Sequence, residues 1–185
     1  MGAAGDTSEA RATGRRIVDA HHHLWDPVRN YHPWLRDEPM IAFRYGDYSA
    51  IRRSYLAADY RSDAAPWVID ASVYVETEWD PADADGEMRF VSDLRRATGL
   101  PTVAVAQAWL DQPECSSVLE QHAARGFVRS VRHNPRANLH PQQGTPGGLT
   151  ETAFRDGVRQ LQPLGLRFDL QTPWWHLGEA RRLAD

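Results

Sequence analysis

Residues Thr102–Arg132, TVAVAQAWLDQPECSSVLEQHAARGFVRSVR, contain the pattern that decides the fold of this chain. An apolar run (102–109) precedes a segment with helical spacing (114–125), and Gly126 separates that segment from a second apolar run (127–132). Nearly continuous apolar runs of this length are typical of strands buried on both faces, and glycine commonly follows the last residue of a helix. The stretch therefore predicts a strand, a helix and a second strand.

The same pattern recurs on both sides of this stretch. Further strands are expected at residues 17–20, 68–75 and 166–170, and further helices at 83–98 and 149–164. Gly99 and Gly165 follow these two helices as Gly126 follows the first. Strands that alternate with helices in this way indicate an α/β fold with a parallel sheet.

A long connection, residues 25–65, interrupts the alternation. It is rich in Tyr, Trp, Pro, Asp and Arg, and we expect one helix within it at about 48–56. Connections of this length in compact α/β domains are uncommon and are often lids or binding loops. An ordinary packed excursion without a ligand role is the alternative.

Composition excludes several classes of protein. The 185 residues include 21 Lys+Arg, 25 Asp+Glu and 42% hydrophobic residues, which is typical of a soluble globular domain. No apolar run approaches the roughly 18 to 20 residues of a membrane helix, and no signal peptide is recognisable, so we expect a cytoplasmic protein without a membrane partner. Residues 1–15 are small and polar and predict a disordered tail before a domain at 16–185.

The charged residues and the single cysteine exclude several kinds of binding site and catalysis. All the cations are arginine and they are scattered along the chain, which does not favour nucleic-acid binding. Without lysine, Schiff-base catalysis and a Walker-type phosphate site are excluded. Cys115 has no second cysteine to pair with, so any transition metal would be held by histidines and carboxylates.

The strongest chemical signal lies at the end of the first expected strand. Side chains alternate along a strand, so Asp19, His21 and His23 should share one face and His22 the other. Two imidazoles on one face can bind one divalent cation such as Zn²⁺ or Mn²⁺. Hydrogen-bonded histidines at a polar strand end are the alternative.

Four segments together resemble a known family. They are VDAHHHLWDP (18–27), YHPWL (31–35), VRSVRHNPRA (128–137) and LRFDLQTPWWHL (166–177). The chain resembles the amidohydrolase-related (amidohydrolase 2), lactonase-like branch of the amidohydrolase superfamily. This resemblance implies a (β/α)8 TIM barrel with its active site at the carboxyl ends of the strands. A complete barrel has eight strands in roughly 250 residues, so the five expected here imply an incomplete barrel, a fragment of about five βα units from the front of such a protein.

The resemblance also implies roles for individual residues. His21 and His23 match the first-strand metal pair, and a bound metal would help water to attack an ester, lactone or amide carbonyl. The fifth strand lacks the histidine that many members of the superfamily carry there, the nearest being His176, and some lactonases of this branch are thought to work without a tightly bound metal. The metal requirement therefore stays open.

The ends of the later strands carry further candidates. Arg132 and His133 match an Arg-His pair of the family, in which the guanidinium would bind a substrate carboxylate and the imidazole would act as the catalytic group on the carbonyl oxygen. Because they are adjacent on a strand, only one of them would point directly inward. An ion pair between Arg132 and a neighbouring acid is the alternative. The expected substrate-binding side chains are Arg132, Trp25, Trp34, Gln171 and His176, with packing as the alternative role for the tryptophans.

Two acidic residues receive structural interpretations. We expect Glu76, after the second strand, to be a solvated loop acid, with a place in the site as the alternative. Asp169, in the fifth strand, is expected to be a buried hydrogen-bond partner.

These observations favour a hydrolase that opens a lactone or a similar cyclic ester, with a small-molecule substrate. A metal-dependent decarboxylase of the same superfamily is the second enzymatic hypothesis. The third is a truncated, non-catalytic chain, unstable by itself or stabilised by pairing its open sheet edges with another chain, for instance as a homo-oligomer.

Overall fold

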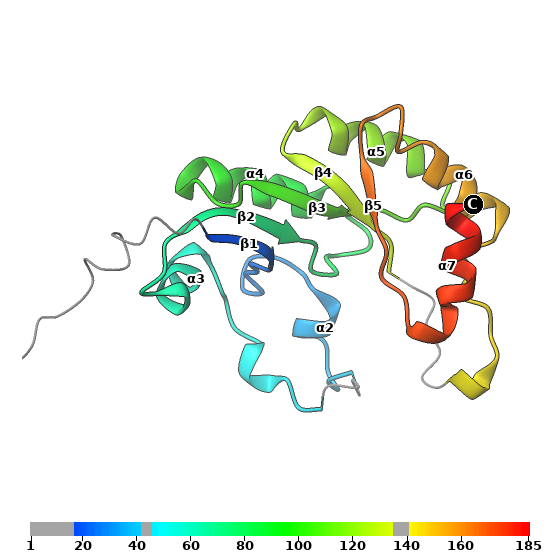
Figure 1. Cartoon of the computed structure of the whole chain (residues 1–185). Coiled ribbons are helices and arrows are strands. Elements are labelled where there is room, and N and C mark those ends of the chain that lie inside the picture. Colours follow the sequence, from blue (N-terminus) through cyan, green and yellow to red (C-terminus); the bar gives the residue numbers. More distant parts are fainter. Residues whose placement is uncertain (1–16, 42–45, 135–140) are drawn as a thin grey trace, which may run out of the picture. The chain divides into compact units, whose positions relative to one another are not determined.

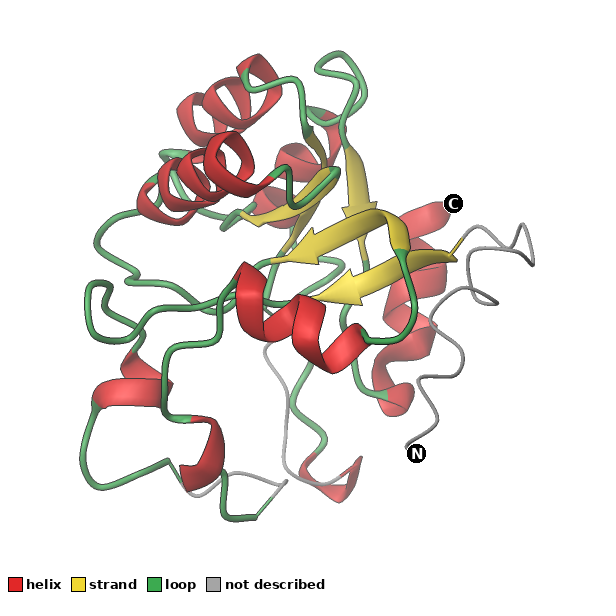
Figure 2. Cartoon of the chain, turned by 90° about the vertical axis from the view of Figure 1, so that its left-hand side faces the viewer, coloured by secondary structure: helices red, strands yellow, loops and turns green. Residues whose placement is uncertain are grey.

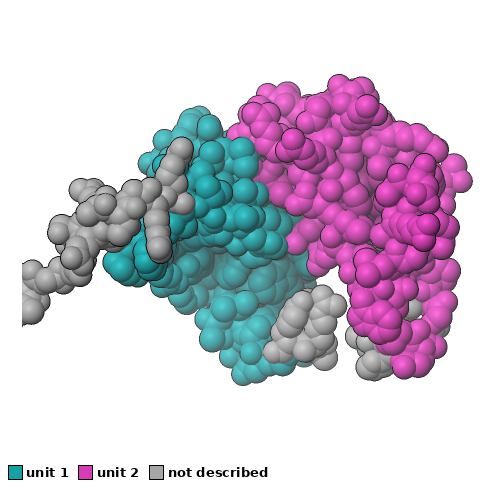
Figure 3. Space-filling model, in the orientation of Figure 1, with its two compact units in different colours: residues 1–103 teal, residues 104–185 magenta. Residues whose placement is uncertain are grey.

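The computed structural model of the chain describes residues 17–41, 46–134 and 141–185. The tail expected at residues 1–15 lies outside the described residues. The chain divides into two compact units, residues 1–103 and 104–185 (Figure 3).

The first unit contains two parallel strands and their connecting helices. Strands β1 (Ile17–His22) and β2 (Ile69–Val75) pair in parallel (Figure 1). The helices are α2 (Pro33–Arg36), a 3-10 turn (Ser49–Ile51), α3 (Ala57–Ala64) and α4 (Gly86–Thr98). Leu24, Tyr74 and Val91 are among its fully buried side chains.

The second unit contains three parallel strands. Its strands are β3 (Val103–Gln107, which begins at the last residue of the first unit), β4 (Val128–Arg132) and β5 (Arg167–Asp169). Strand β4 pairs in parallel with β3 and with β5. The helices are α5 (Cys115–Ala124), α6 (Thr152–Arg159) and α7 (Leu177–Ala184), with 3-10 turns at Pro141–Gln143 and Trp174–His176. Figure 2 shows the strands and helices of the chain in separate colours.

The glycines expected after the helices have left-handed backbones. The φ angles are 79° at Gly99, 66° at Gly126 and 68° at Gly165, where a Cβ atom would be strained. The five expected strands and the three helices expected between them are confirmed, with bounds that differ from the prediction by at most five residues.

The prediction of a helix at about 48–56 is wrong. That segment holds only the 3-10 turn, and the true helix, α3, starts at Ala57. Its start is marked by Asp59, whose Oδ2 accepts the backbone N–H of Leu56 at 2.9 Å. A carboxylate three residues after the helix-capping position satisfies an N–H group that the helix leaves unpaired.

None of the helices in the described residues has the length and apolarity that crossing a bilayer requires.

Candidate active site

Two imidazoles of β1 and the residue after it face each other. The Nε2 atoms of His21 and His23 are 3.2 Å apart. Nδ1 of His23 lies 2.8 Å from the carbonyl oxygen of Val75, which can only accept, so Nδ1 carries the proton and Nε2 presents a lone pair. Zn–N bonds measure about 2.0–2.1 Å, so nitrogens about 3 Å apart fit binding to one ion. The carbonyl contact is the kind that fixes the tautomer of a metal-binding histidine.

A β-bulge between Asp19 and His22 overturns one expectation. Asp19 pairs with Ser72 and His22 with Tyr74, so three steps along β1 match two steps along β2. The extra residue breaks the alternation, and Asp19 shares a face with His22 instead of with His21. Both side chains contact Tyr60 of α3, through a hydrogen bond of 2.8 Å to Asp19 and ring stacking at 4.6 Å on His22.

The expected tryptophans lie beside the imidazole pair. The ring centroid of Trp25 is 6.3 Å from that of His23 and 5.7 Å from that of Trp34. Nε1 of Trp34 donates to the carbonyl of Thr77 at 2.8 Å, which ties α2 to the end of β2. The first unit thus brings His21, His23, Trp25 and Trp34 together.

The end of β2 contains a buried polar network that the sequence did not reveal. Glu76 is fully buried, so its interpretation as a solvated acid is wrong. Glu87 of α4 is also buried and accepts hydrogen bonds from Tyr74 and from Thr77. Burial, then the charge of Glu76, raises the pKa of Glu87 to about 7. His32 contacts Thr77 at 3.1 Å, and burial lowers its pKa to about 4.

The second unit aligns polar side chains across three strands. In the sheet register Gln107 of β3 pairs with Arg132 of β4, which pairs with Asp169 of β5. Paired residues of parallel strands share a face, so these three form a row at the strand ends. Asp169 accepts a hydrogen bond from Ser130, as expected, but it is exposed instead of buried. Gln107 was not singled out, although it ends an otherwise apolar strand.

His133 lies on the other face of β4. Its ring packs edge-on against Trp109 (5.2 Å) and against Phe154 of α6 (5.0 Å). The backbone N–H of Leu110 donates to Nδ1 at 3.0 Å, so Nδ1 carries no proton and the neutral ring has its hydrogen on Nε2. Arg132 is therefore the member of the pair on the face away from α6, and the catalytic role of His133 stays a prediction.

Gln171 and His176 follow β5. His176 is 5% exposed, and its Nε2 lies 3.2 Å from the carbonyl oxygen of Thr145. Nδ1 of His176 and Oε1 of Gln171 are buried polar atoms without a hydrogen-bond partner among the residues that the structure describes. Such atoms are costly to bury, so both positions are suited to a polar ligand. Their substrate-binding role stays a prediction.

The described residues contain no group of three or more His, Cys, Asp or Glu side chains arranged to hold a metal ion. His21 and His23 alone supply only two of the donors that a metal ion would need. Structural zinc is usually four-coordinate, so further donors are required.

Sequence comparison finds one informative relative and no matching family model. Uncharacterized protein y4mH of Sinorhizobium fredii (strain NBRC 101917 / NGR234) is 31% identical over 174 residues, covering 91% of this chain and 57% of the relative. The chain thus spans little more than half the length of this relative.

Solved structures share the fold. Amidohydrolase 2 from Bifidobacterium longum subsp. infantis is 23% identical with a TM-score of 0.61, over 91% of this chain and 56% of that one. A Burkholderia multivorans amidohydrolase with bound zinc is 19% identical (TM-score 0.61; 91% and 53%). A probable 2-pyrone-4,6-dicarboxylic acid hydrolase from Acinetobacter baumannii, with citric acid bound, is 12% identical (TM-score 0.57; 88% and 52%). The chain therefore has the fold of amidohydrolase-superfamily proteins over about half their length, an incomplete (β/α)8 barrel of five βα units.

Proposed function

We propose that the chain carries part of the active site of an amidohydrolase-related hydrolase that opens a lactone or a similar cyclic ester. The observation that carries this proposal is the imidazole pair: Nε2 of His21 and Nε2 of His23 lie 3.2 Å apart, and a carbonyl holds Nδ1 of His23. Because Nδ1 of His23 carries the proton, its Nε2 accepts a hydrogen bond from Nε2–H of His21, and a cation bound between the two rings would take the place of that proton.

The proposed metal is a divalent cation, with zinc as the first candidate because zinc is bound in the Burkholderia multivorans structure of the same fold. His21 and His23 would be two of its ligands. A divalent cation bound there would polarise a carbonyl oxygen and make water a better nucleophile at neutral pH.

The proposed substrate carries a carboxylate. Arg132 presents a guanidinium at the end of β4, and a guanidinium binds a carboxylate through two parallel hydrogen bonds. Gln107 and Asp169 flank it in the sheet and would orient it, because their side chains share its face.

Lactone opening adds water across the ring C–O bond and yields a hydroxy acid. The test is a pH-stat measurement with the full chain, zinc and a panel of lactones with and without a carboxylate. We expect proton release without CO₂ and a preference for carboxylated lactones. Release of CO₂ from an aromatic acid would instead indicate the decarboxylase, and no turnover of either class would overturn the proposed activity.

Substitutions in the site test the proposed metal binding and the proposed carboxylate binding separately. His21→Ala and His23→Ala should each abolish tight zinc binding, and the double variant should lose no more than either single one, because the two ligands act on one ion. Arg132→Met should raise KM for carboxylated lactones much more than for neutral ones. Arg129→Met, an exposed arginine of the same strand, is the matched control.

A further inference from the structure

The bulge in β1 has its own support on the face that α3 covers. The carboxylate of Asp19 accepts the backbone N–H of His21 at Oδ1 (3.0 Å) and the hydroxyl of Tyr60 at Oδ2 (2.8 Å). A bulge leaves backbone groups outside the regular ladder, and a carboxylate two residues earlier can satisfy the freed N–H. Hydrogen bonds to a carboxylate are also shorter and stronger than those between neutral groups.

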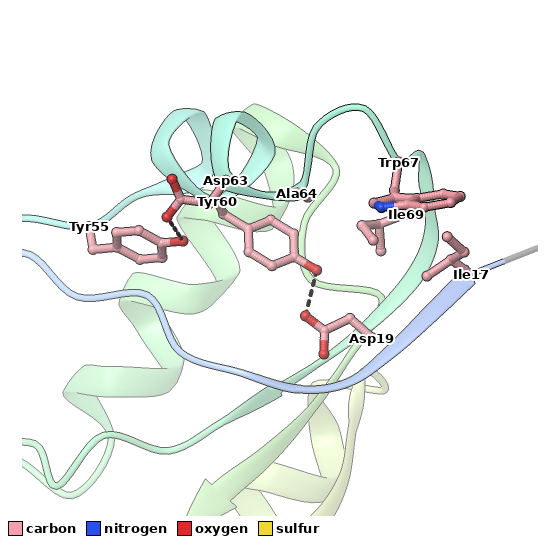
Figure 4. A pocket seen from close by; sticks show the side chains of 8 residues that line it. All are labelled: Ile17, Asp19, Tyr55, Tyr60, Asp63, Ala64, Trp67 and Ile69. Carbon is pink, nitrogen blue, oxygen red and sulfur yellow. Dashed lines mark hydrogen bonds between the residues drawn. The ribbon is translucent and has the colours of Figure 1, made fainter. Parts of the chain in front are cut away.

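Tyr60 contacts the chain on both sides of His21. Its hydroxyl holds Asp19, two residues before, and its ring lies 4.6 Å from that of His22 with an angle of 28° between the planes. Figure 4 shows the hydroxyl of Tyr60, on α3, directed at the carboxylate of Asp19 on β1. One side chain of α3 thus fixes the backbone from which His21 projects.

The hydrogen bond between Tyr60 and Asp19 keeps its proton on the tyrosine. Burial and the bond to Asp19 raise the pKa of Tyr60, so its hydroxyl keeps the proton that it donates.

We propose that Asp19 and Tyr60 are positioning residues for His21: they clamp the β1 bulge so that Nε2 of His21 meets Nε2 of His23. The inference rests on the proposed function for its consequence in metal binding. The clamp itself can be measured without any metal.

The chain offers a matched control in the same hollow. Tyr55 donates to Oδ2 of Asp63 at 2.8 Å, the same length as the bond from Tyr60 to Asp19, but Asp63 lies on α3 and not on β1 (Figure 4). Tyr60→Phe keeps the ring that stacks on His22 and removes only the hydroxyl. Tyr55→Phe removes an equivalent hydroxyl that does not touch the bulge.

The first readout is hydrogen exchange of the His21 backbone amide, measured by NMR on the metal-free chain. Loss of one hydrogen bond of about 1.4 kcal/mol corresponds to about tenfold faster exchange. We expect this for Asp19→Ala, a smaller increase for Tyr60→Phe, and no change for Tyr55→Phe. Asp19→Asn keeps an oxygen acceptor at the same place, so the backbone amide of His21 should stay mostly protected from exchange. This variant still tests the clamp if Asp19→Ala fails to fold.

The second readout is zinc affinity by competition with a chromophoric chelator. Residues that orient metal ligands change affinity about 10- to 100-fold when removed. We expect about tenfold weaker binding for Tyr60→Phe and unchanged binding for Tyr55→Phe. Equal behaviour of the two Phe variants in amide exchange and affinity would overturn the clamp. If the unaltered chain binds no zinc, the metal part of the proposed function fails, and amide exchange alone decides the clamp.

Discussion

Replacing Glu87 with glutamine should remove a pH dependence of stability that the buried network creates. Oε1 of Glu87 accepts bonds from the Tyr74 hydroxyl (2.9 Å) and from the backbone N–H and hydroxyl of Thr77 (2.7 and 2.6 Å). Burial, then the nearby charge of Glu76, raises its pKa from 4.5 to about 7. The folded protein therefore binds this proton more tightly than the unfolded chain does.

This difference in proton binding determines whether stability rises or falls with pH. A carboxyl whose pKa is raised on folding contributes its full stability below about pH 4.5 and loses it as pH rises towards about 7. Each tenfold change in proton affinity is worth about 1.4 kcal/mol, so the whole rise corresponds to roughly 3 kcal/mol. Glutamine stays neutral and keeps an oxygen acceptor, so Glu87→Gln should gain roughly 3 kcal/mol relative to the unaltered chain between pH 4.5 and 8.

The assay is urea unfolding at intervals from pH 4.5 to 8, with the difference in free energy of unfolding plotted against pH. Glu76→Gln should flatten the pH dependence in part, because it removes the neighbouring charge. Glu120→Gln, an exposed substitution on α5, is the control. A difference that does not vary with pH, or that favours the unaltered chain at high pH, would refute the reasoning.

Two further predictions concern the second unit. Gly157→Ala would place a Cβ atom 2.0 Å from the carbonyl oxygen of Leu110, so we expect a loss of about 1–3 kcal/mol in urea unfolding. Gly178→Ala would place a Cβ atom 3.8 Å from Nη1 of Arg182, an ordinary contact, and should instead stabilise helix α7 by up to about 1 kcal/mol. Equal effects of the two substitutions would contradict this packing. Glu179→Gln leaves one oxygen for two backbone N–H groups and should cost about 1–3 kcal/mol. The same variant should also speed hydrogen exchange at the backbone amide of Leu149. Unchanged exchange there would show that the carboxylate of Glu179 does not protect this amide.

The order of the elements could be predicted because the signals are local. Gly126 marks a helix end without help from distant contacts, because the left-handed backbone found there strains any residue with a Cβ atom. The segment 48–56 misled because its apolar residues have helical spacing although the helix begins only at Ala57. Asp59, three residues after Leu56, was the signal that could have corrected the boundary.

The candidate site could be predicted only where side chains alternate regularly between the two faces of a strand. Regular alternation groups His21 with His23 and also groups them with Asp19, and the bulge keeps the first relation and breaks the second. A bulge depends on pairing with a distant strand, so sequence spacing alone could not place it. The burial of Glu76 was hidden for a similar reason, because helix α4, which brings Glu87 to it, is ten residues further along the chain.

The polar groups buried in the first unit are concentrated where the proposed chemistry would occur. The carbonyl of Val75 holds His23, and Thr77, two residues later, holds Trp34 and Glu87. Each buried polar group costs free energy unless it is satisfied, so packing alone would favour apolar side chains at a strand end. The buried polar groups at the end of β2 therefore support the proposed site, because the carbonyl of Val75 orients the imidazole of His23 there.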